Sequence, residues 1–331
     1  MLRARSVVRS YGGRTVIDID DLTIERGKIT AIVGPNGCGK STLLRILSFV
    51  ETPSAGNLTL DEKPISTAKD RRWARSRVTL VEQKPLLFRG TVEDNLRYAL
   101  SLRRTDPTKV ASMVAESLDR LQALTLAKRD ARQLSEGEAQ LVAVARALSL
   151  KPAVLLLDEP ASAADRATIG KLYGVLQAER ESGTAICLAS HQLEDAYRWS
   201  DDIITLAGGR IGSTTPENLF RTIIPEKTGY TTVEAGALTL HIIAESPGPA
   251  SVMIPPEDIV LSTEPLRSSA RNQFCGTVIK ISDDGRGHIT VVADCGSDLT
   301  ARITSGALEE LGIGVGSQVF LSVKATAVQV F

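Results

Sequence analysis

The chain has 331 residues, more than a single domain usually needs, and its 39 Lys and Arg residues balance 39 Asp and Glu residues. Aromatic residues make up only 4%, whereas broad nucleic-acid binding favours clustered cations and stacking rings, so we expect no nucleic-acid partner. No apolar run approaches the roughly 18 to 20 residues that span a bilayer, and the first ten residues hold no apolar block. We therefore expect neither a membrane span nor a signal peptide.

The four cysteines show no CxxC spacing; they are Cys38, Cys187, Cys275 and Cys295. This spacing argues against a zinc site and against a disulfide framework. We expect reduced thiols and a cytoplasmic protein.

Over the first 225 residues or so, strand-like runs alternate with helical ones, as in KITAIVG followed by STLLRILSFV and AVLLLDE followed by ATIGKLYGVLQAER. This alternation is typical of a parallel sheet with crossover helices. The basic run KDRRWARSR at 69–77 is interpreted as a solvated loop. Between about 88 and 150 the apolar residues recur at helical spacing, which predicts a helical subdomain inserted in the α/β core.

Beyond about residue 225 the chain consists of short β-rich runs separated by Gly, Pro and Asp, such as GTVIKI and HITVVAD. The predicted fold class is therefore an α/β core followed by a small all-β domain, an OB-like or Greek-key barrel. We expect 226–267 to hold a linker and a first β segment, and 268–331 to form the β domain.

A phosphate-binding loop is predicted at GPNGCGKST, residues 34–42, which fits GxxxxGK[ST] between a strand and a helix. Its glycines let backbone N–H groups wrap the phosphates of ATP, and the helix that follows directs its positive dipole end at them. Lys40 supplies charge for the β and γ phosphates, and the Ser41 hydroxyl is placed to bind Mg²⁺. The expected contacts are Gly34, Asn36, Gly37, Cys38, Gly39, Lys40, Ser41 and Thr42.

The stretch VLLLDEP at 154–160 is an apolar strand that ends in two acids. Asp158 would hold Mg²⁺ through water, and Glu159, one residue nearer the γ-phosphate, would polarise an attacking water. Together with the phosphate loop, these acids predict an ATP hydrolase that uses ATP and Mg²⁺.

The ordered motifs over roughly residues 5–212 resemble the nucleotide-binding subunits of ABC transporters. The resemblance implies that Tyr11 stacks on adenine, that Gln83 touches Mg²⁺ and that His191 is the switch histidine. LSEGE at 134–138 matches the family signature, so Ser135 and Gly137 would contact the γ-phosphate bound to the opposite subunit. ASAAD at 161–165 resembles the loop that crosses the dimer.

One chain holds one phosphate loop and one signature, so two complete sites require a head-to-tail homodimer that sandwiches two ATP molecules. The resemblance further implies separate transmembrane permease subunits and an extracytoplasmic binding protein. It places the protein on the cytoplasmic face of the inner membrane.

Three positions depart from the family pattern, which reads LSGGQ. Glu136 replaces a glycine, Glu138 replaces the glutamine, and Leu141 stands where an arginine is usual. A carboxylate about 4 Å from phosphate oxygens would cost on the order of 1 to 4 kcal/mol. We therefore expect Glu136 to point away from the phosphate.

The segments 269–281, 299–312 and 323–330 resemble, in order and spacing, the molybdate-binding Mop module of oxyanion-binding proteins. In that family the anion lies at a β–β interface, where backbone amides, hydroxyls and a lysine hold it. Several convergent donors suit a tetrahedral dianion such as molybdate or tungstate. Carried over by position, the candidate contacts are Ser269, Arg271, Ser305, Lys324, Ala325 and Thr326.

The leading interpretation is the ATPase subunit of a molybdate or tungstate importer, whose β domain senses the cargo and pairs with that of a second subunit. A first alternative keeps the motor but has a structural β domain and another cargo, such as sulfate, a sugar, a polyamine or iron. A second alternative, of another class, is a soluble non-transport ATPase or an oxyanion sensor.

Overall fold

The computed structural model describes residues 1–161, 166–190, 196, 198–212, 218–226, 229–283 and 288–330. The chain divides into two compact units, Met1–Ser213 and Thr214–Phe331, each with its own hydrophobic core. The division lies earlier than the boundary predicted near residue 225. The reason is that β11 (Asn218–Ile224) pairs along its whole length with β14 (Gly248–Ile254) of the second unit.

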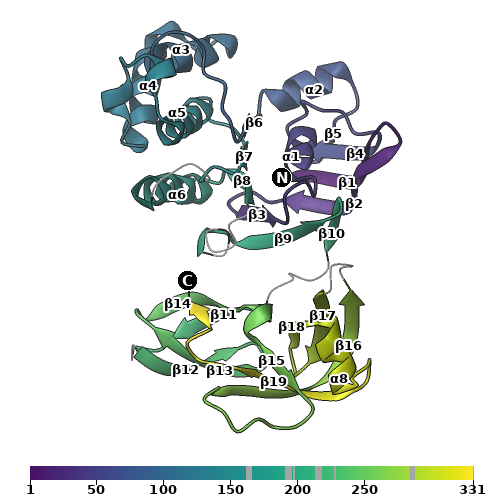
Figure 1. Ribbon diagram of the computed structural model, residues 1–331. Helices are drawn as coiled ribbons and strands as arrows, with labels where there is room; N and C mark the ends of the chain where they lie inside the picture. The colour runs from purple at the N-terminus through teal and green to yellow at the C-terminus, as the bar shows by residue number, and fades with distance from the viewer. Residues whose placement is uncertain are drawn as a thin grey trace. The chain divides into compact units, whose positions relative to one another are not determined.

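A six-stranded sheet forms the centre of the first unit (Figure 1). Its strand order is β10-β9-β3-β8-β7-β6, and all neighbours run parallel except β10 and β9. Every residue of the three central strands is buried, as expected where both faces of a parallel sheet are covered. The strands are β3 (Ile29–Val33), β6 (Val78–Val81), β7 (Val154–Asp158), β8 (Ala185–Ser190), β9 (Asp202–Ala207) and β10 (Arg210–Gly212).

The two faces of this sheet belong to different cores. Leu155 and Leu157 of β7 pack with residues of the helices α5 (Glu136–Ser149) and α6 (Arg166–Glu181). Leu156, which points the other way, packs with α1 (Lys40–Leu47) and an antiparallel sheet of order β2-β1-β4-β5. The strands of that second sheet are β1 (Leu2–Tyr11), β2 (Arg14–Ile24), β4 (Ala55–Leu60) and β5 (Lys63–Pro64).

The helical insertion lies where the sequence predicts it. It holds α3 (Val92–Leu102), α4 (Pro107–Arg120) and α5, with short 3₁₀ turns at Leu124–Leu126 and Ala131–Gln133. Each helix has a side-chain cap at its start, for example Thr91 and Asp94 in a reciprocal capping box on α3.

The basic run interpreted as a loop is largely helical, so that interpretation was wrong. α2 spans Ala68–Arg75, and Thr67 and Asp70 form a capping box at its start. The Thr67 hydroxyl accepts from the Asp70 N–H at 3.1 Å, and the Asp70 carboxylate accepts from the Thr67 N–H at 3.1 Å. This cap offsets the repulsion among the cations that follow it.

The second unit is a β structure that also contains the short α-helix α8 (Ser305–Leu311) (Figure 1). Its sheets have the orders β11-β14-β20, β12-β13 and β15-β19-β16-β17-β18, and one hydrophobic core joins all three. The remaining strands are β12 (Gly229–Ala235), β13 (Leu238–Ala244), β15 (Val260–Ser262), β16 (Asn272–Asp283), β17 (His288–Asp294), β18 (Asp298–Thr304), β19 (Gln318–Val323) and β20 (Gln329–Val330).

Two buried asparagines tie these sheets together. The Asn218 amide donates to the carbonyl of Ile254, at 3.0 Å, and to that of Thr300 on β18, at 2.8 Å. Asn272 at the start of β16 accepts from the His241 N–H at 2.7 Å and donates to the His241 carbonyl at 2.9 Å, on β13. Both are almost completely buried. Within the described residues, no helix has the length and apolar character needed to cross a membrane.

Candidate active site

The phosphate loop joins β3 to α1, and three of its positions require glycine. A Cβ at Gly34 would lie 2.1 Å from the Leu206 carbonyl oxygen, and a Cβ at Gly39 would lie 2.7 Å from the Ile17 side chain. Gly37 and Gly39 have φ values of 80° and 112°, in the left-handed region that favours glycine. The loop therefore holds a conformation in which backbone N–H groups can surround phosphate.

The first helical residue, Lys40, is only 6% exposed. Its ammonium donates to the Gly34 carbonyl at 2.7 Å and lies 3.9 Å from the Glu159 carboxylate. Glu159 follows β7, which is separated from β3 in the sheet only by β8. The carboxyl ends of these strands thus bring the predicted lysine and the predicted acid together, at the edge where ligands bind α/β sheets.

Asp158, at the end of β7, is 7% exposed. Burial raises the pKa of its carboxyl, while a hydrogen bond with Ser41 and the charge of Lys40 act in the opposite direction. The hydroxyl and the carboxylate predicted to bind Mg²⁺ are therefore neighbours.

Glu159 is fixed from two sides. Its backbone N–H donates to the Ala189 carbonyl at 2.9 Å, and its φ of 47° is unusual for a residue with a side chain. The Gln83 amide, two residues beyond β6, donates to the Glu159 carboxylate at 3.0 Å. Strain at a residue that ends a buried strand is a common mark of a functional position.

Other predicted loop and adenine contacts are more exposed. Tyr11 ends β1 with 44% of its surface exposed, donates to Glu51, and has the Arg9 guanidinium 4.5 Å from its ring centroid. One face of the ring is thereby occupied. Asn36 is exposed and Thr42 half-buried.

Cys38 differs from the expectation, because its side chain is buried in the apolar core beside Gly34. Its N–H donates to the Pro35 carbonyl at 3.3 Å. Any contact from this residue to phosphate would come from the backbone.

The signature serine caps α5. The Ser135 hydroxyl accepts from the Glu138 N–H at 3.2 Å, and the Ser135 N–H donates to the Glu138 carboxylate at 2.8 Å. These hydrogen bonds, followed by the charge of Arg129 at 2.9 Å, lower the pKa of Glu138. Glu138 therefore replaces the family glutamine as a structural residue at the helix start.

The other two departures also have clear positions. Glu136, the first residue of α5, is exposed, and Gly137 is half-buried beside it. Leu141 is buried in the core that α5 forms with the sheet, so this position contributes packing in place of charge. His191 and residues 162–165 of the ASAAD loop lie outside the described residues.

The oxyanion candidates fall into two groups. β16 pairs with β19 in a register that sets Asn272 opposite Val323, so Arg271 and Lys324 follow at the same end of the ladder. Ser269, Ala325 and Thr326 flank them, and all of these except Ala325 are exposed. Ser305 is different.

Ser305 directly follows β18, whose last residue, Thr304, pairs with His288 at the start of β17. The next residue of β17, Ile289, pairs with Asp283 at the far end of β16. The ladder thus places Ser305 and Arg271 at opposite ends of a twelve-residue strand. Within one chain, the sheet brings together five of the six candidates and leaves Ser305 apart.

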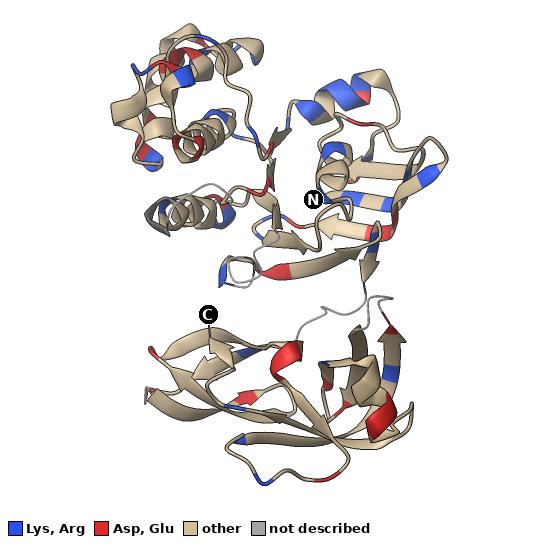
Figure 2. Cartoon of the chain, viewed as in Figure 1, with Lys and Arg blue, Asp and Glu red and all other residues tan. Residues whose placement is uncertain are grey.

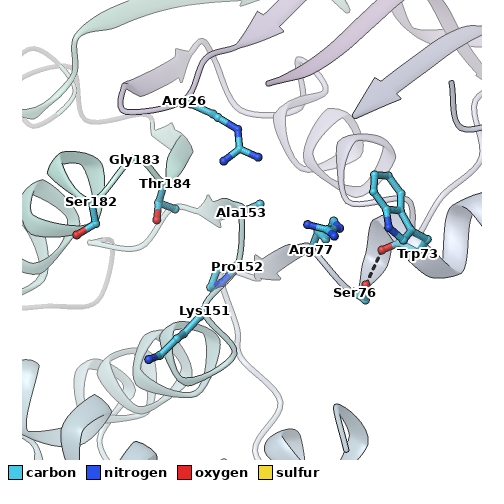
Figure 3. Close-up of a pocket in the computed structure, with 10 residues that line it drawn as sticks. All are labelled: Arg26, Trp73, Ser76, Arg77, Lys151, Pro152, Ala153, Ser182, Gly183 and Thr184. Atoms are coloured by element: carbon cyan, nitrogen blue, oxygen red, sulfur yellow. Dashed lines mark hydrogen bonds between the residues drawn. The ribbon is translucent and has the colours of Figure 1, made fainter. Parts of the chain in front are cut away.

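A hollow of about 500 Å³ lies at the opposite edge of the central sheet from the phosphate loop (Figure 3). It is lined by residues that precede the strands, including Arg26 before β3, Arg77 before β6 and Thr184 before β8. Helices α2, α5 and α6 end beside it, and the cations offset the negative partial charge of helix C-termini. This hollow is separate from the phosphate site, and we assign it a structural role.

Two residues with a place in the site were missed by sequence reasoning. Arg129 forms an ion pair with Glu138. The Glu51 carboxylate accepts a hydrogen bond from the Tyr11 hydroxyl and forms an ion pair with the Arg9 guanidinium at 2.7 Å. Glu51 is far from both partners in the chain, and no sequence pattern marked it.

Family models match the chain in two places. The ABC transporter model matches residues 17–162, and the TOBE domain model matches residues 268–330. The molybdate/tungstate import ATP-binding protein of Pyrococcus abyssi is 31% identical over 347 aligned residues, which covers 100% of both chains. The chain is an ATP-binding protein of the ABC transporter family.

Two further matches cover about two thirds of the chain. The tungstate uptake system ATP-binding protein of Peptoclostridium acidaminophilum is 40% identical over 207 residues, 62% of this chain and 93% of that protein. The solved dimer of a bacterial ABC transporter cassette has a TM-score of 0.59 and 27% identity, and covers 64% of this chain and 96% of that one. The ABC transporter protein described here thus has an ATP-hydrolysing cassette followed by a TOBE domain.

Proposed function

We propose that this ABC transporter protein is the ATP-hydrolysing subunit of an importer for tungstate or molybdate, with an anion-binding C-terminal domain. The observation that carries the proposal is the Pyrococcus match, which extends over both units in order. Subunits named for phosphate or for spermidine and putrescine import match 63% and 66% of the chain, and the Peptoclostridium tungstate subunit matches 62%, whereas the Pyrococcus protein matches both units. This full-length match is what favours tungstate or molybdate as the cargo.

In the proposed reaction, Glu159 accepts a proton from the water that attacks the γ-phosphate. Gln83 orients the carboxylate through the 3.0 Å hydrogen bond, and Lys40, 3.9 Å away, can shift from it to the phosphates when ATP enters. The glycine amides of the loop and the start of α1 stabilise the negative charge of the phosphates.

The residues present also fit Mg²⁺. Ser41, Asp158 and Gln83 offer a hydroxyl, a carboxylate and an amide oxygen, which are the hard ligands that Mg²⁺ prefers. The described residues include no cluster of three His, Cys, Asp or Glu side chains able to hold a metal. We propose that Mg²⁺ binds with ATP and neutralises phosphate charge, while these three side chains position it.

We further propose a head-to-tail homodimer, in which Ser135 and Gly137 of one subunit contact ATP on the other. The Ser135 N–H is occupied by Glu138, so its hydroxyl hydrogen and the Gly137 N–H are the donors left for phosphate. Tyr11 offers its free ring face to adenine, and His191 is proposed as the switch histidine.

A groove of about 380 Å³ on the ATPase unit suits a membrane partner. It is lined by Val50, Leu80 and Arg75, among others. The large apolar side chains Leu86, Phe88, Tyr98 and Leu102 in the neighbouring segment are 48 to 77% exposed, and such exposure marks protein interaction sites. We propose that separate permease subunits dock here. In this proposal the protein lies at the cytoplasmic face of the membrane, and an extracytoplasmic binding protein delivers the cargo to the permease.

The anion is proposed to lie between two C-terminal domains. Arg271 and Lys324 supply positive charge at one end of the β16–β19 ladder, and Ser269 and Thr326 supply hydroxyl donors there. Because Ser305 lies at the other end of β16, it would reach the anion from the second copy.

Isothermal titration calorimetry of the purified protein with tungstate, molybdate and sulfate tests the proposal. We expect tungstate and molybdate to bind tightly and sulfate weakly. Lys324→Gln should abolish binding, and Lys280→Gln, an exposed lysine of the same domain, should not. Equal binding of sulfate would favour another cargo, and absence of any anion binding would leave the domain structural.

A further inference from the structure

Three cations, Lys69, Arg72 and Arg75, form a stripe along the exposed face of α2. They are spaced three residues apart, so they follow one side of the helix, while Ala74 on the other side is fully buried in the core. Figure 2 shows Lys and Arg along most of this helix. The chain as a whole carries no net charge, so this concentration of positive charge is local.

Within the described residues, the cations of the stripe, Lys69, Arg72 and Arg75, form no ion pairs. The acid on the same helix, Asp70, is occupied by its cap with Thr67 and by Lys63 at 2.9 Å. Hydrogen bonds from these two residues hold the pKa of Asp70 well below its usual range. The three cations are therefore available to an external anion.

The stripe borders the groove described above. Arg75 lines that groove, and Arg103 at the end of α3 donates to the Arg75 carbonyl at 2.9 Å, which fixes the end of α2 to the helical insertion. If a permease fills the groove, the rim of the groove faces the membrane that holds the permease. This step rests on the proposed function.

We propose that the stripe binds the anionic phospholipid headgroups of the membrane surface. A straight row of exposed cations can meet several phosphates of one plane at once, and each cation near an anionic surface raises partitioning about fivefold. Protein interfaces are depleted in Lys and usually centre on a buried aromatic or apolar anchor. None of the large exposed apolar side chains among the described residues belongs to α2.

Three such cations give about a hundredfold gain, which is reversible and falls with salt. The stripe therefore orients the cassette against the membrane and leaves the main contact to the groove.

Co-sedimentation of the full chain with vesicles tests this inference. Vesicles of phosphatidylcholine, with or without phosphatidylglycerol, are compared for the wild type and for Lys69→Gln/Arg72→Gln/Arg75→Gln. The matched control is Lys109→Gln/Lys171→Gln/Lys280→Gln, which removes three exposed charges elsewhere. ATP binding checks that each variant is folded.

We expect the wild type and the control to bind only vesicles that contain phosphatidylglycerol, with less binding in high salt. The stripe variant should bind about a hundredfold more weakly, and Arg72→Lys/Arg75→Lys should retain binding because charge is what matters. Undiminished binding by the stripe variant would overturn the inference. So would a wild type that ignores vesicles while the stripe variant binds the permease less well in detergent, because the partner would then be a protein.

The vesicle assay itself needs neither permease nor cargo, so its result is separate from that of the anion calorimetry. Vesicle binding without tungstate binding would support lipid binding by the stripe and count against the proposed cargo.

Discussion

Glu159 shows how the site is assembled residue by residue. The strand β7 ends one residue earlier, and the backbone turns at Glu159 with a positive φ, so that its carboxylate meets Gln83 and Lys40. Neither neighbour is close in the chain. The glutamate is thereby held in one orientation before substrate arrives, which reduces the entropy lost in the reaction.

Replacing Glu159 by Gln should reduce steady-state ATP hydrolysis by a factor of about 10² to 10⁴, because the proton acceptor is removed while the phosphate loop is retained. ATP should still bind, and the variant should accumulate as an ATP-bound dimer. Phosphate release and size-exclusion chromatography with ATP measure the two effects. Near-normal turnover would show that another group is the base.

Glu138 contributes to stability in a pH-dependent way. Its pKa is lowered in the folded protein by Ser135 and Arg129, so its contribution is present above the unfolded pKa of about 4.3 and is lost as pH falls through the folded value. Glu138→Gln should therefore destabilise the ATPase unit by about 0.5 to 1 kcal/mol at neutral pH, and by less below about pH 4.

Urea unfolding followed by tryptophan fluorescence measures this difference, because Trp73 and Trp199 both lie in the first unit. Glu116→Gln, an exposed glutamate in the middle of α4, is the control. A loss of stability that is the same at both pH values would mean that the charge of Glu138 has no role.

At the scale of elements, the second unit depends on polar contacts between sheets. Strands β11 and β16 start at Asn218 and Asn272, and each asparagine makes hydrogen bonds to the backbone of another sheet. Such buried amides fix which strands lie together, since backbone groups left without a partner in the core are costly.

Asn272→Leu should destabilise the second unit by about 2 to 4 kcal/mol, because it leaves the His241 N–H and carbonyl without partners. For a unit of this size the midpoint should fall on the order of 10 °C. Scanning calorimetry resolves the transition of this unit, and Gln318→Leu, at an exposed position of β19, is the control. Equal midpoints for the two variants would show that the hydrogen bonds between Asn272 and His241 do not stabilise the unit.

At the scale of the whole molecule, each chain contains half of each proposed site. The phosphate loop lies on the central sheet and Ser135 lies at the start of α5 in the helical insertion. In the proposed head-to-tail dimer, hydrolysis is therefore a property of two chains.

Mixing two inactive variants tests this. Lys40→Ala disables the loop and Ser135→Arg disables the signature, so each homodimer should be inactive. Half of the dimers in a random mixture contain one chain of each kind. Such a dimer has one intact site, formed by the loop of the Ser135→Arg chain and the signature of the Lys40→Ala chain. Hydrolysis should recover to about a quarter of the wild-type rate. No recovery would indicate that each site lies within one chain.

The C-terminal domain should couple cargo to hydrolysis. If an anion binds between two such domains, anion binding and domain pairing strengthen each other by the same free energy. We expect cytoplasmic tungstate or molybdate to lower hydrolysis by the assembled transporter, and Lys324→Ala to remove that effect while basal hydrolysis persists. Lys280→Ala should respond as the wild type does, and an unchanged response of Lys324→Ala would place the sensor elsewhere.

The sequence by itself determined the α/β class, the helical insertion, the β-rich tail and the phosphate loop. These features depend on local patterns, because a glycine-rich turn or an apolar run has the same preference wherever it occurs. Asp158 and Glu159 could be recognised for the same reason, since they stand at the end of a continuous buried strand.

Only the tertiary structure decided which distant groups meet. Gln83 reaches Glu159, Glu51 receives Tyr11, and the ladder register separates Ser305 from Arg271. Most of the basic run at 69–77 lies in the helix α2, which has one exposed charged face. The helix forms because Thr67 and Asp70 cap its start and Ala74 packs in the core. Such pairings depend on strand order and packing, which no local pattern of residues specifies.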